Sequence, residues 1–415
     1  MKDVIVIGAG PGGSTLATLL SQSGFQVSLL EKQCFPRFKI GESLLPRGNS
    51  VLKRSGVWPL IEQAGFPQKW AAEFTHGDGR ERVHNVFAQG LLSGWDYTYQ
   101  VDRARFDSLL LDHARSSGVE VLQPVQIREV REIPGRGWSI AATDDSGQDH
   151  VLKARFLADA SGRACVLARH LGLGKRDIQL PSRMAVFSHF TGVPRAKDRF
   201  GGDIRIVRIP RGWFWVIPID AERTSVGLVF CQKDRSRGIT AEAFFHDQIA
   251  RHPLMRKWMA AARAQMEFHT DADFSYIHSS FAGDRHVLLG DAAAFLDPVF
   301  SSGVYLSLEA ASSSADMISS ALRKGKCLRR GEIRRYERNY LKRLKTMESL
   351  IRVFYDERQF PVFMNPRPLF QLPEAVNSIV AGHTLLPFAL RWRYALFLGI
   401  CKLNRYVDVV PPVSL

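Results

Sequence analysis

The stretch VIVIGAGPGG at residues 4–13 decides the fold of this chain. Its first four residues form a short apolar run bounded by glycine, which predicts a buried parallel strand. The run leads into G-x-G-x-x-G, where Gly8 permits a tight turn, Gly10 lets a pyrophosphate approach the backbone, and Gly13 lets helix and strand pack closely. The pattern therefore predicts a dinucleotide-binding βαβ unit.

The residues that follow support this interpretation. We expect a helix at residues 14–23, whose N-terminus offers N–H groups and positive potential to phosphates. A second strand at 26–31 ends in Glu31, about 20 residues after the turn, where a carboxylate accepts hydrogen bonds from ribose hydroxyls. An acid there disfavours a 2′-phosphate. A glycine-rich turn that binds nothing would not need all three features.

The rest of the chain alternates between two kinds of sheet. Apolar runs at 153–160 and 286–290 predict buried parallel strands, whereas period-two alternation from 184 to 231 predicts an antiparallel sheet. We expect helices at 105–117, 240–265 and 304–323, and basic helices beyond 324. The predicted fold class is mixed α/β (α+β). It comprises a discontinuous Rossmann-like nucleotide-binding domain (1–75, 100–175 and 281–323), an inserted antiparallel-sheet substrate domain (76–99 and 176–280) and a C-terminal helical region (324–415).

Three more signals follow in chain order: Arg103 in QVDRARFDSLL, the turn from Asp159 to Gly162, and Gly290-Asp291 after a strand. Each alone is weak, because a buried aspartate after a strand is often only a helix N-cap. Together with the glycine turn they resemble the markers of flavoproteins related to aromatic hydroxylases, in which the last aspartate meets the ribityl chain. The resemblance implies that the dinucleotide is FAD.

Two further motifs narrow the resemblance. WFWVIP at 213–218 matches the W-x-W-x-I-P sequence of flavin-dependent halogenases, and FLDPVFSSG at 295–303 matches their F-x-x-P-x-x-S-x-G sequence. FKIGESLLP at 38–46 resembles the family's segment beside the isoalloxazine. As far as about residue 323, the chain is identified as a member of this family, of the phenol and pyrrole type rather than the tryptophan type. The cofactor-binding residues this implies are Gly8, Gly10, Pro11, Gly13, Glu31, Lys32, Gly41, Glu42, Ser43, Arg103, Val125, Asp159, Gly162, Asp291, Pro298, Gly303 and Val304.

Trp213, Trp215 and Pro218 have a plain interpretation as a well-packed strand, because aromatic residues dominate sheet cores. In the family these aromatics are thought to wall the flavin from the organic substrate. Such a wall has a physical reason, since the flavin must oxidise halide rather than hydroxylate the substrate directly.

Lys69, in GFPQKWAAEF, matches the family's essential lysine. A lysine ammonium can donate a hydrogen bond to hypohalous acid, and a neutral amine can instead be attacked to give a haloamine. Partial burial lowers a lysine pKa and would assist the second route. Most lysines are simply solvated, but Phe66, Trp70 and Phe74 favour partial enclosure here. We therefore expect Lys69 to be catalytic.

Phe300 marks a departure from the tryptophan halogenases, which carry a glutamate at this position to help halogenate the indole. Without that carboxylate an indole substrate is disfavoured, whereas phenols and pyrroles are more strongly activated. The family's halide site maps to Ser302 and Gly303. Consecutive backbone N–H groups before a helix make a suitable anion nest, so physics and resemblance agree.

Composition sets the remaining bounds. With 45% hydrophobic and 23% charged residues, the 415-residue chain is neither disordered nor collagen-like nor a coiled coil. Its 56 Lys and Arg against 41 Asp and Glu give a net charge of +15, which favours acidic partners. Five scattered cysteines without a metal-ligand spacing indicate a reduced, cytoplasmic protein and no metal site. No targeting or membrane-spanning segment is visible.

The basic stretch at 323–345 holds eleven Lys and Arg against two Glu. Three interpretations stay open: a solvated helix face, a docking face for an acidic acyl carrier protein, and contact with an anionic membrane. The last is helped by the amphipathic LRWRYALFLGICKL near the C-terminus.

The resemblance implies a two-component halogenase. A separate NAD(P)H-dependent flavin reductase would deliver FADH2, which reacts with O2 to a C4a-hydroperoxide. Halide (chloride or bromide) attacks it, and the hypohalous acid passes to Lys69 to halogenate an electron-rich aromatic small molecule. One alternative is an FAD-dependent monooxygenase or geranylgeranyl-reductase-like oxidoreductase on the same fold. A second, an FAD-containing nucleic-acid-binding protein, is motivated only by charge, because the aromatic interleaving of single-strand binders is missing.

Overall fold

A mixed sheet forms the centre of the larger half of the molecule. The computed structural model describes residues 1–178, 182–210, 212–235, 238–273, 275–365 and 368–410. The strand order is β19-β20-β10-β1-β2-β7, with β8 and β9 joined to the side of β10. Their bounds are β1 Lys2–Ile7, β2 Val27–Leu30, β7 Glu120–Leu122, β8 Val125–Ile133, β9 Gly137–Asp144, β10 Asp149–Asp159, β19 Ala282–Gly283 and β20 His286–Leu288. Strands β20, β10, β1, β2 and β7 pair in parallel, as their continuous apolar runs predict.

A second sheet follows the order β16-β12-β15-β14-β13-β4-β5, and β17 also pairs with β12. Its strands are β4 Ala71–His76, β5 Arg82–Val86, β12 Arg183–Thr191, β13 Ile204–Ile209, β14 Gly212–Pro218, β15 Thr224–Cys231, β16 Arg263–Ala264 and β17 His269–Asp273. Among the described residues, the strand pairs of this sheet are antiparallel, except that β13 pairs in parallel with β4. The predicted fold class is confirmed. Strand β4 crosses the expected boundary at residue 75, and the division into domains stays a prediction.

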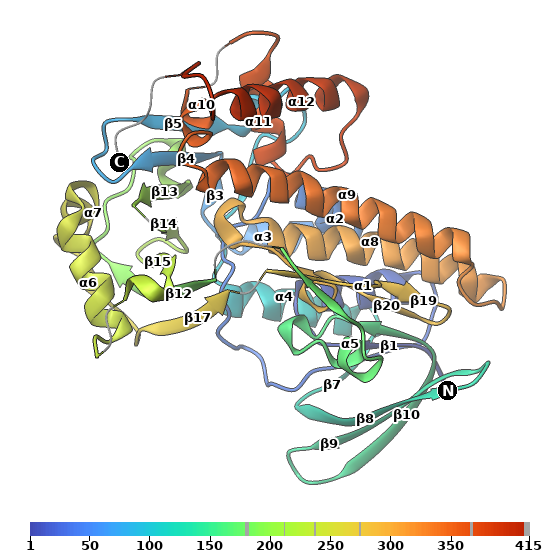
Figure 1. The fold of residues 1–415 in the computed structure, drawn as a ribbon. Coiled ribbons are helices and arrows are strands. Elements are labelled where there is room, and N and C mark those ends of the chain that lie inside the picture. The colour runs from blue at the N-terminus through green and yellow to red at the C-terminus, as the bar shows by residue number, and fades with distance from the viewer. Residues whose placement is uncertain (179–181, 211, 236–237, 274, 366–367, 411–415) are drawn as a thin grey trace.

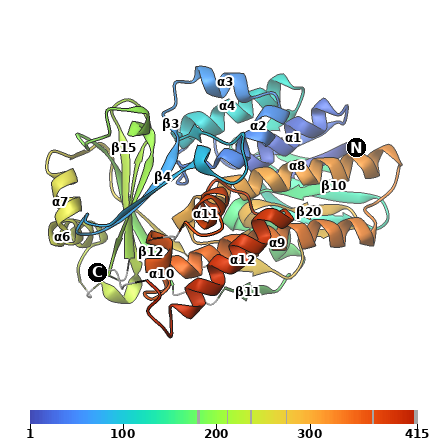
Figure 2. The ribbon, with the colours of Figure 1, turned by 90° about the horizontal axis from the view of Figure 1, so that it is seen from above.

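Helices cover both sheets (Figures 1 and 2). Helix α1 (Pro11–Gln22) packs between α8 (Ser302–Arg323) and α4 (Arg103–Ser116) against the first sheet, and α6 (Ala241–Arg251) and α7 (Pro253–Met259) lie beside the second. Helices α9 (Arg330–Tyr355), α10 (Phe360–Met364), α11 (Leu372–Val380) and α12 (Phe388–Leu403) follow. The helical region predicted at 240–265 consists of α6 and α7, which are separate because a proline at position 253 has no N–H to continue the hydrogen bonds of α6. Its last part is wrong, because residues 263–264 form strand β16.

The shorter elements connect these layers. They are α2 Asn49–Arg54, α3 Trp58–Gln63, α5 Val166–His170, β3 Gln68–Lys69, β6 Thr98–Tyr99, β11 Lys175–Asp177, β18 Tyr276–His278 and β21 Ala294–Phe295. One large apolar core joins the first sheet, the inner face of the second sheet and helices α8 to α12. The outer face of the second sheet has its own core with α6 and α7. Within the described ranges, no helix is long and apolar enough to cross a bilayer.

Candidate active site

Of the glycines at positions 8, 10, 12 and 13 in the turn, only Gly10 has free space where a side chain would begin. A Cβ on Gly13 would lie 1.9 Å from the Gly8 carbonyl oxygen, and one on Gly8 would lie 2.5 Å from that of Ala160, so both are closed by packing. A Cβ on Gly10 would meet nothing nearer than Arg37 Nη2 at 3.9 Å. Gly10 therefore faces free space at the N-terminus of α1, with a guanidinium beside it. This arrangement fits a pyrophosphate.

Two of the predicted cofactor residues also hold turns together. Glu31 Oε2 accepts the Ala9 N–H at 2.8 Å and Oε1 accepts that of Gln33 at 3.0 Å. The fully buried Asp159 accepts the N–H groups of Ser161 and Leu167, at 2.9 and 2.7 Å. Asp159 thus fixes the chain after β10, and its contact with a cofactor stays a prediction.

Asp291 is the residue that the resemblance assigns to the ribityl chain of a flavin, and its contact with a cofactor stays a prediction. Burial raises the pKa of its carboxyl group, and Lys39, Arg163 and Arg103 oppose that rise. Among the described residues none donates a hydrogen bond to this carboxylate, so it is available to hydroxyl groups. Pro298 and Gly303, two further residues that the resemblance assigns to the cofactor, are exposed. The residues present therefore fit FAD.

The remaining predicted cofactor residues occupy varied positions. Pro11 is the first residue of α1, the Val125 N–H donates to the Glu31 carbonyl oxygen at 2.8 Å, and Lys32 is exposed. Gly162 has φ +63° with no atom near its missing Cβ. Val304 is half-buried in the first turn of α8.

Arg103 supports the segment predicted to lie beside the isoalloxazine. Its Nε and Nη2 donate to the two Asp107 oxygens at 2.8 and 2.9 Å, a forked ion pair within one helical turn. Its Nη1 donates to the carbonyl oxygens of Ile40 at 2.7 Å and Gly41 at 3.2 Å. At φ +102°, Gly41 leaves no room for a Cβ, which would lie 2.9 Å from Nη1. The guanidinium thus fixes the backbone of this segment.

Lys69 approaches the same segment from β3. Its side chain is 1% exposed, and Nζ donates to Ser43 Oγ and to the Leu44 carbonyl oxygen, both at 2.9 Å. The ring centroid of Phe87 lies 5.4 Å from Nζ. No carboxylate of the described chain lies within ion-pair distance of it. Burial lowers the pKa of Lys69 to about 7, against the attraction of Asp203.

Asp203, which the sequence did not point to, positions the backbone next to Lys69. Its Oδ1 accepts the N–H groups of Trp70 and Ala71 at 2.7 and 2.9 Å, and its Oδ2 lies 2.9 Å from His84 Nε2. Asp203 is separated from Trp70 by 133 positions and reaches it because β13 pairs in parallel with β4. No local motif could have revealed it.

The predicted halide loop leads into α8. Asp297 Oδ1 caps the turn by accepting the Val299 N–H at 3.0 Å, and Ser301 adopts φ +55° before the helix begins at Ser302. Ser302 is buried, whereas Gly303 is exposed with nothing within 4 Å of its missing Cβ. The first N–H groups of a 22-residue helix thus border open space. Helix N-termini attract anions.

Phe300 lies inside an aromatic cluster rather than beside a polar group. Its ring centroid is 5.4 Å from that of Phe74, 6.1 Å from Phe354 and 5.9 Å from Phe363. The position that carries a glutamate in tryptophan halogenases is therefore apolar here, as expected.

Trp213 and Trp215 point to the same face of β14, with ring centroids 5.9 Å apart. Trp213 Nε1 donates to the Tyr355 hydroxyl at 2.7 Å, and that hydroxyl donates to Asp297 Oδ2 at 2.6 Å. Tyr355 of α9 thereby connects the tryptophan motif, which ends at the buried Pro218, with the halide loop. No motif in the sequence pointed to Tyr355.

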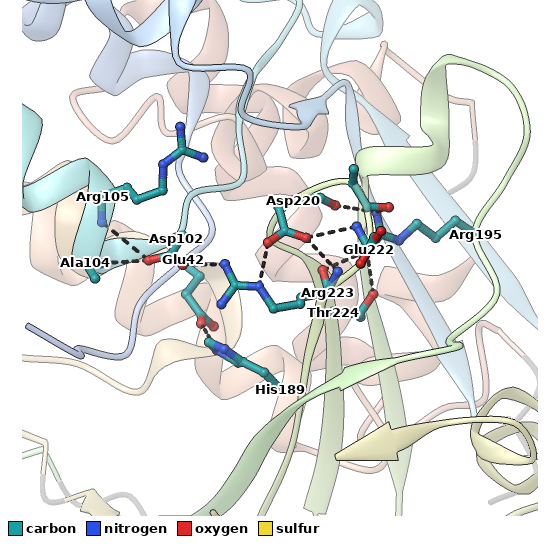
Figure 3. A network of polar contacts seen from close by, with 11 residues as sticks. Glu42, Asp102, Ala104, Arg105, His189, Arg195, Asp220, Glu222, Arg223 and Thr224 are labelled. Atoms are coloured by element: carbon teal, nitrogen blue, oxygen red, sulfur yellow. Dashed lines mark hydrogen bonds and ion pairs between the residues drawn. The ribbon is translucent and has the colours of Figure 1, made fainter. Parts of the chain in front are cut away.

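Polar contacts also join the second sheet and its β14–β15 turn to Glu42 and to the start of α4 (Figure 3). His189 Nε2 of β12 lies 2.6 Å from Glu42 Oε1, and both side chains are buried. Arg223, after the β14–β15 turn, donates to Asp102 at 2.8 Å at the start of α4. The Glu42–His189 contact therefore ties the predicted flavin segment to the second sheet, which also carries the tryptophan motif on β14. Among the described residues, no group of three or more His, Cys, Asp or Glu could hold a metal ion.

Comparison with known proteins agrees with this geometry. A family model described as "Tryptophan halogenase" matches residues 3–92 and 79–381. The match therefore continues well beyond residue 323, where the resemblance was expected to fade. A 1H-pyrrole-2-carbonyl peptidyl-carrier-protein chlorinase from Pseudomonas fluorescens is 35% identical over 343 residues, 76% of this chain and 75% of the relative. A tryptophan 2-halogenase from Chondromyces crocatus is 33% identical over 328 residues, 77% of this chain and 61% of the relative.

A solved structure of the flavin-dependent brominase Bmp2 superposes with a TM-score of 0.85 at 25% identity, covering 98% of this chain and 100% of that one. The family expected from the motifs is confirmed. This chain therefore belongs to the tryptophan halogenase family of flavin-dependent halogenases, and it is an oxidoreductase that uses FAD, dioxygen and a halide ion.

Proposed function

We propose that this enzyme is a two-component halogenase that receives FADH2 from a separate reductase, makes hypohalous acid and uses Lys69 to halogenate an electron-rich phenol or pyrrole. The observation that carries the proposal is the Lys69 amine, which is buried against Ser43 and Leu44 with no carboxylate in contact. An amine with a pKa of about 7 can donate a proton or act as a nucleophile near neutral pH.

When bound, reduced FAD supplies with O2 the oxidising equivalent that turns halide into hypohalous acid. The chain's own residues do the rest. The N–H groups of Ser302 and Gly303 hold the halide at the start of α8. Trp213 and Trp215 separate the flavin from the aromatic substrate, and Lys69 directs the electrophile. Both routes at Lys69, hydrogen bonding by the ammonium and haloamine formation by the neutral amine, stay open.

The substrate class is inferred from Phe300 and its neighbours. Phe74, Phe354 and Phe363 surround the position where an indole-directing glutamate would stand. We therefore favour a phenol or pyrrole ring. The similarity to a pyrrole chlorinase that acts on a peptidyl-carrier-bound ring supports a substrate tethered to an acyl carrier protein as one form, and a free ring is the other. A cytoplasmic location and the three-part domain division remain parts of this proposal.

Halide dependence tests the proposal directly. The full-length protein with FAD, a flavin reductase and NADH should convert small phenols or carrier-bound pyrroles to halogenated products only when bromide or chloride is added, as read by mass spectrometry. Turnover of the same rings without halide would show a monooxygenase or reductase on this fold instead. The nucleic-acid-binding alternative was motivated by charge alone and gains no support from the fold or the family.

A further inference from the structure

The C-terminal helices carry a concentration of exposed apolar side chains. Nine of the fourteen exposed large hydrophobic residues of the described chain lie between residues 369 and 407. We call these nine the α12 surface: Leu369, Phe370, Leu385, Phe388, Trp392, Leu396, Leu403, Tyr406 and Val407. A contiguous exposed apolar face on a folded protein marks an interaction site.

Helix α12 is apolar on two sides. Its inward face buries Leu390, Tyr394, Phe397 and Cys401 against the other C-terminal helices. Its outward face presents Phe388 at 73% exposure, Trp392 at 36%, Leu396 at 37% and Leu403 at 51%. A helix that is hydrophobic all round is normally buried in protein or in lipid. Only one side of α12 is buried within the described chain.

The surface is preorganised by a neighbouring turn. Phe370 and Gln371 both adopt left-handed backbone angles, φ +53° and +59°, although neither is glycine. Arg393 holds them there, donating to the Phe370 carbonyl oxygen at 2.8 Å and to Gln371 Oε1 at 2.9 Å. The Phe370 ring is 65% exposed and lies 6.2 Å from that of Trp392. Strain that presents an aromatic ring to solvent is typical of functional sites.

The charge along residues 369–407 is mostly positive. Residues 369–407 contain four cations, Arg391, Arg393, Lys402 and Arg405, and a single acid, Glu374. Within the described ranges neither Arg391 nor Lys402 makes an ion pair. A second copy of the chain would bring these cations against one another, whereas an anionic surface would neutralise them.

We propose that the α12 surface binds an anionic lipid bilayer, with α12 lying in the plane of the interface. Exposed Phe, Trp and Leu flanked by Arg and Lys are the residues that interfacial helices insert at the boundary between headgroups and acyl chains. The net charge of +15 adds long-range attraction to the same membrane. In Figures 1 and 2, α12 lies on the outside of the helical layer, with α11 and α9 between it and the sheets.

Vesicle sedimentation with the full-length protein tests this proposal. Vesicles of phosphatidylcholine with 30% phosphatidylglycerol, roughly a physiological anionic fraction, should bind the wild type, and pure phosphatidylcholine should bind it at least about tenfold more weakly. Phe388→Ser with Trp392→Ser should weaken binding at least about tenfold. Trp392→Phe, which keeps an aromatic ring, should retain it.

Matched controls separate the α12 surface from general charge and general hydrophobicity. Arg334→Gln with Arg338→Gln removes two exposed cations of α9, and Val151→Ser removes an exposed apolar side chain elsewhere. Each should change binding less than about threefold. Equal weakening by the α9 variant would overturn the proposal in favour of diffuse electrostatic attraction.

Other occupants give different results. If the serine variant bound vesicles normally but turned over a carrier-tethered ring poorly, the surface would be a carrier docking site, and the membrane proposal would be wrong. If the wild type were a dimer and the serine variant a monomer, the α12 surface would be an interface with a second copy of the chain, and the membrane proposal would be wrong. The halide-dependence assay is independent of all these readouts, so failure of one proposal does not affect the other.

Discussion

Two buried cations hold the segment from Ile40 to Leu44, and they differ in one respect. Arg103 donates hydrogen bonds to the carbonyl oxygens of Ile40 and Gly41 at one end. It also forms a forked ion pair with the Asp107 carboxylate, which raises the pKa of the guanidinium. Lys69 donates hydrogen bonds to Ser43 and Leu44 at the other end, where both acceptors are neutral, and burial lowers its pKa to about 7. The same task of holding a loop is thus done by one paired and one unpaired cation.

The difference separates structure from chemistry. A buried cation with a hydrogen-bonded carboxylate keeps its proton at any physiological pH and serves as a fixed anchor. A buried cation with neutral partners is desolvated without compensation, so its proton is loosely held. Perturbed groups of this kind cluster at catalytic sites. The comparison predicts that Lys69 matters for turnover and Arg103 for the stability of the flavin segment.

The largest effect should come from Lys69→Met. We expect product formation to fall about 10³-fold, as for loss of a proton-transferring or nucleophilic group. The bound flavin should be unchanged, since Gly10, Asp291 and Arg103 are untouched. Mass spectrometry of product and the visible flavin spectrum measure the two quantities. Lys257→Met, an exposed lysine of α7, is the control; halogenation retained by Lys69→Met would remove Lys69 from the mechanism.

Asp107→Asn should act on the fold instead. It leaves the Arg103 guanidinium buried without its carboxylate, which costs about 3 kcal/mol of the free energy of unfolding. Denaturant unfolding followed by fluorescence measures the loss. Asp112→Asn in the same helix removes an exposed pair with Arg115 and should cost below about 1 kcal/mol. Equal costs for the two variants would mean that the Arg103 fork is not an anchor.

The pH dependence of the free energy of unfolding should reveal the lowered pKa of Lys69. The folded state releases this proton at a pKa of about 7, and the unfolded chain keeps it up to about the ordinary value of 10.5. Between these two pH values the unfolded state binds more protons than the folded state. The free energy of unfolding of the wild type therefore rises by about 1.4 kcal/mol for each pH unit above 7, and below pH 7 this group adds no pH dependence.

The Lys69→Met variant lacks this contribution. Its stability relative to wild type should therefore be greatest near pH 6 and should shrink steadily towards pH 10. Parallel unfolding curves at several pH values measure the difference. A difference that did not vary with pH would show that the Lys69 pKa is ordinary.

The smallest effect should come from Asp203→Asn. The Asp203 carboxylate raises the Lys69 pKa, and an amide in its place keeps an acceptor for the Trp70 and Ala71 N–H groups. In a plot of halogenation rate against pH, we expect the apparent pKa near 7 to fall by about half a pH unit. An activity that rises as the pH passes this pKa indicates the neutral amine, and one that falls indicates the ammonium. An apparent pKa that moved upward would contradict the assignment to Lys69.

The first βαβ unit could be predicted because its determinants are neighbours in the chain. Gly13 packs on Gly8, five positions earlier, and apolar strands flank both. The tryptophan and halide motifs could likewise be found, because each is a short run of fixed residues. That the two motifs belong to one site was inferred from family resemblance, because their spacing in the sequence does not predict that WFWVIP and FLDPVFSSG lie close together.

The candidate site depended on contacts between distant segments. Asp203 reaches Trp70 across a parallel pairing, and Tyr355 joins Trp213 to Asp297 from a helix outside the recognised motifs. Glu31 and Asp159 have the predicted positions, and each of them also holds a backbone turn. Which polar atoms a side chain meets cannot be deduced from its local pattern.

The amino-acid sequence by itself determined the nucleotide-binding turn and the parallel and antiparallel character of the strands, because each depends on residue type and short-range period. Family resemblance singled out Lys69 as the lysine expected to be catalytic. Only the tertiary structure decided the state of that lysine. A pKa is set by the water that packing removes and by the charges it leaves nearby. Around Lys69 these come from the segment at 43–44, from Phe87 and from Asp203, which only the folded chain brings together.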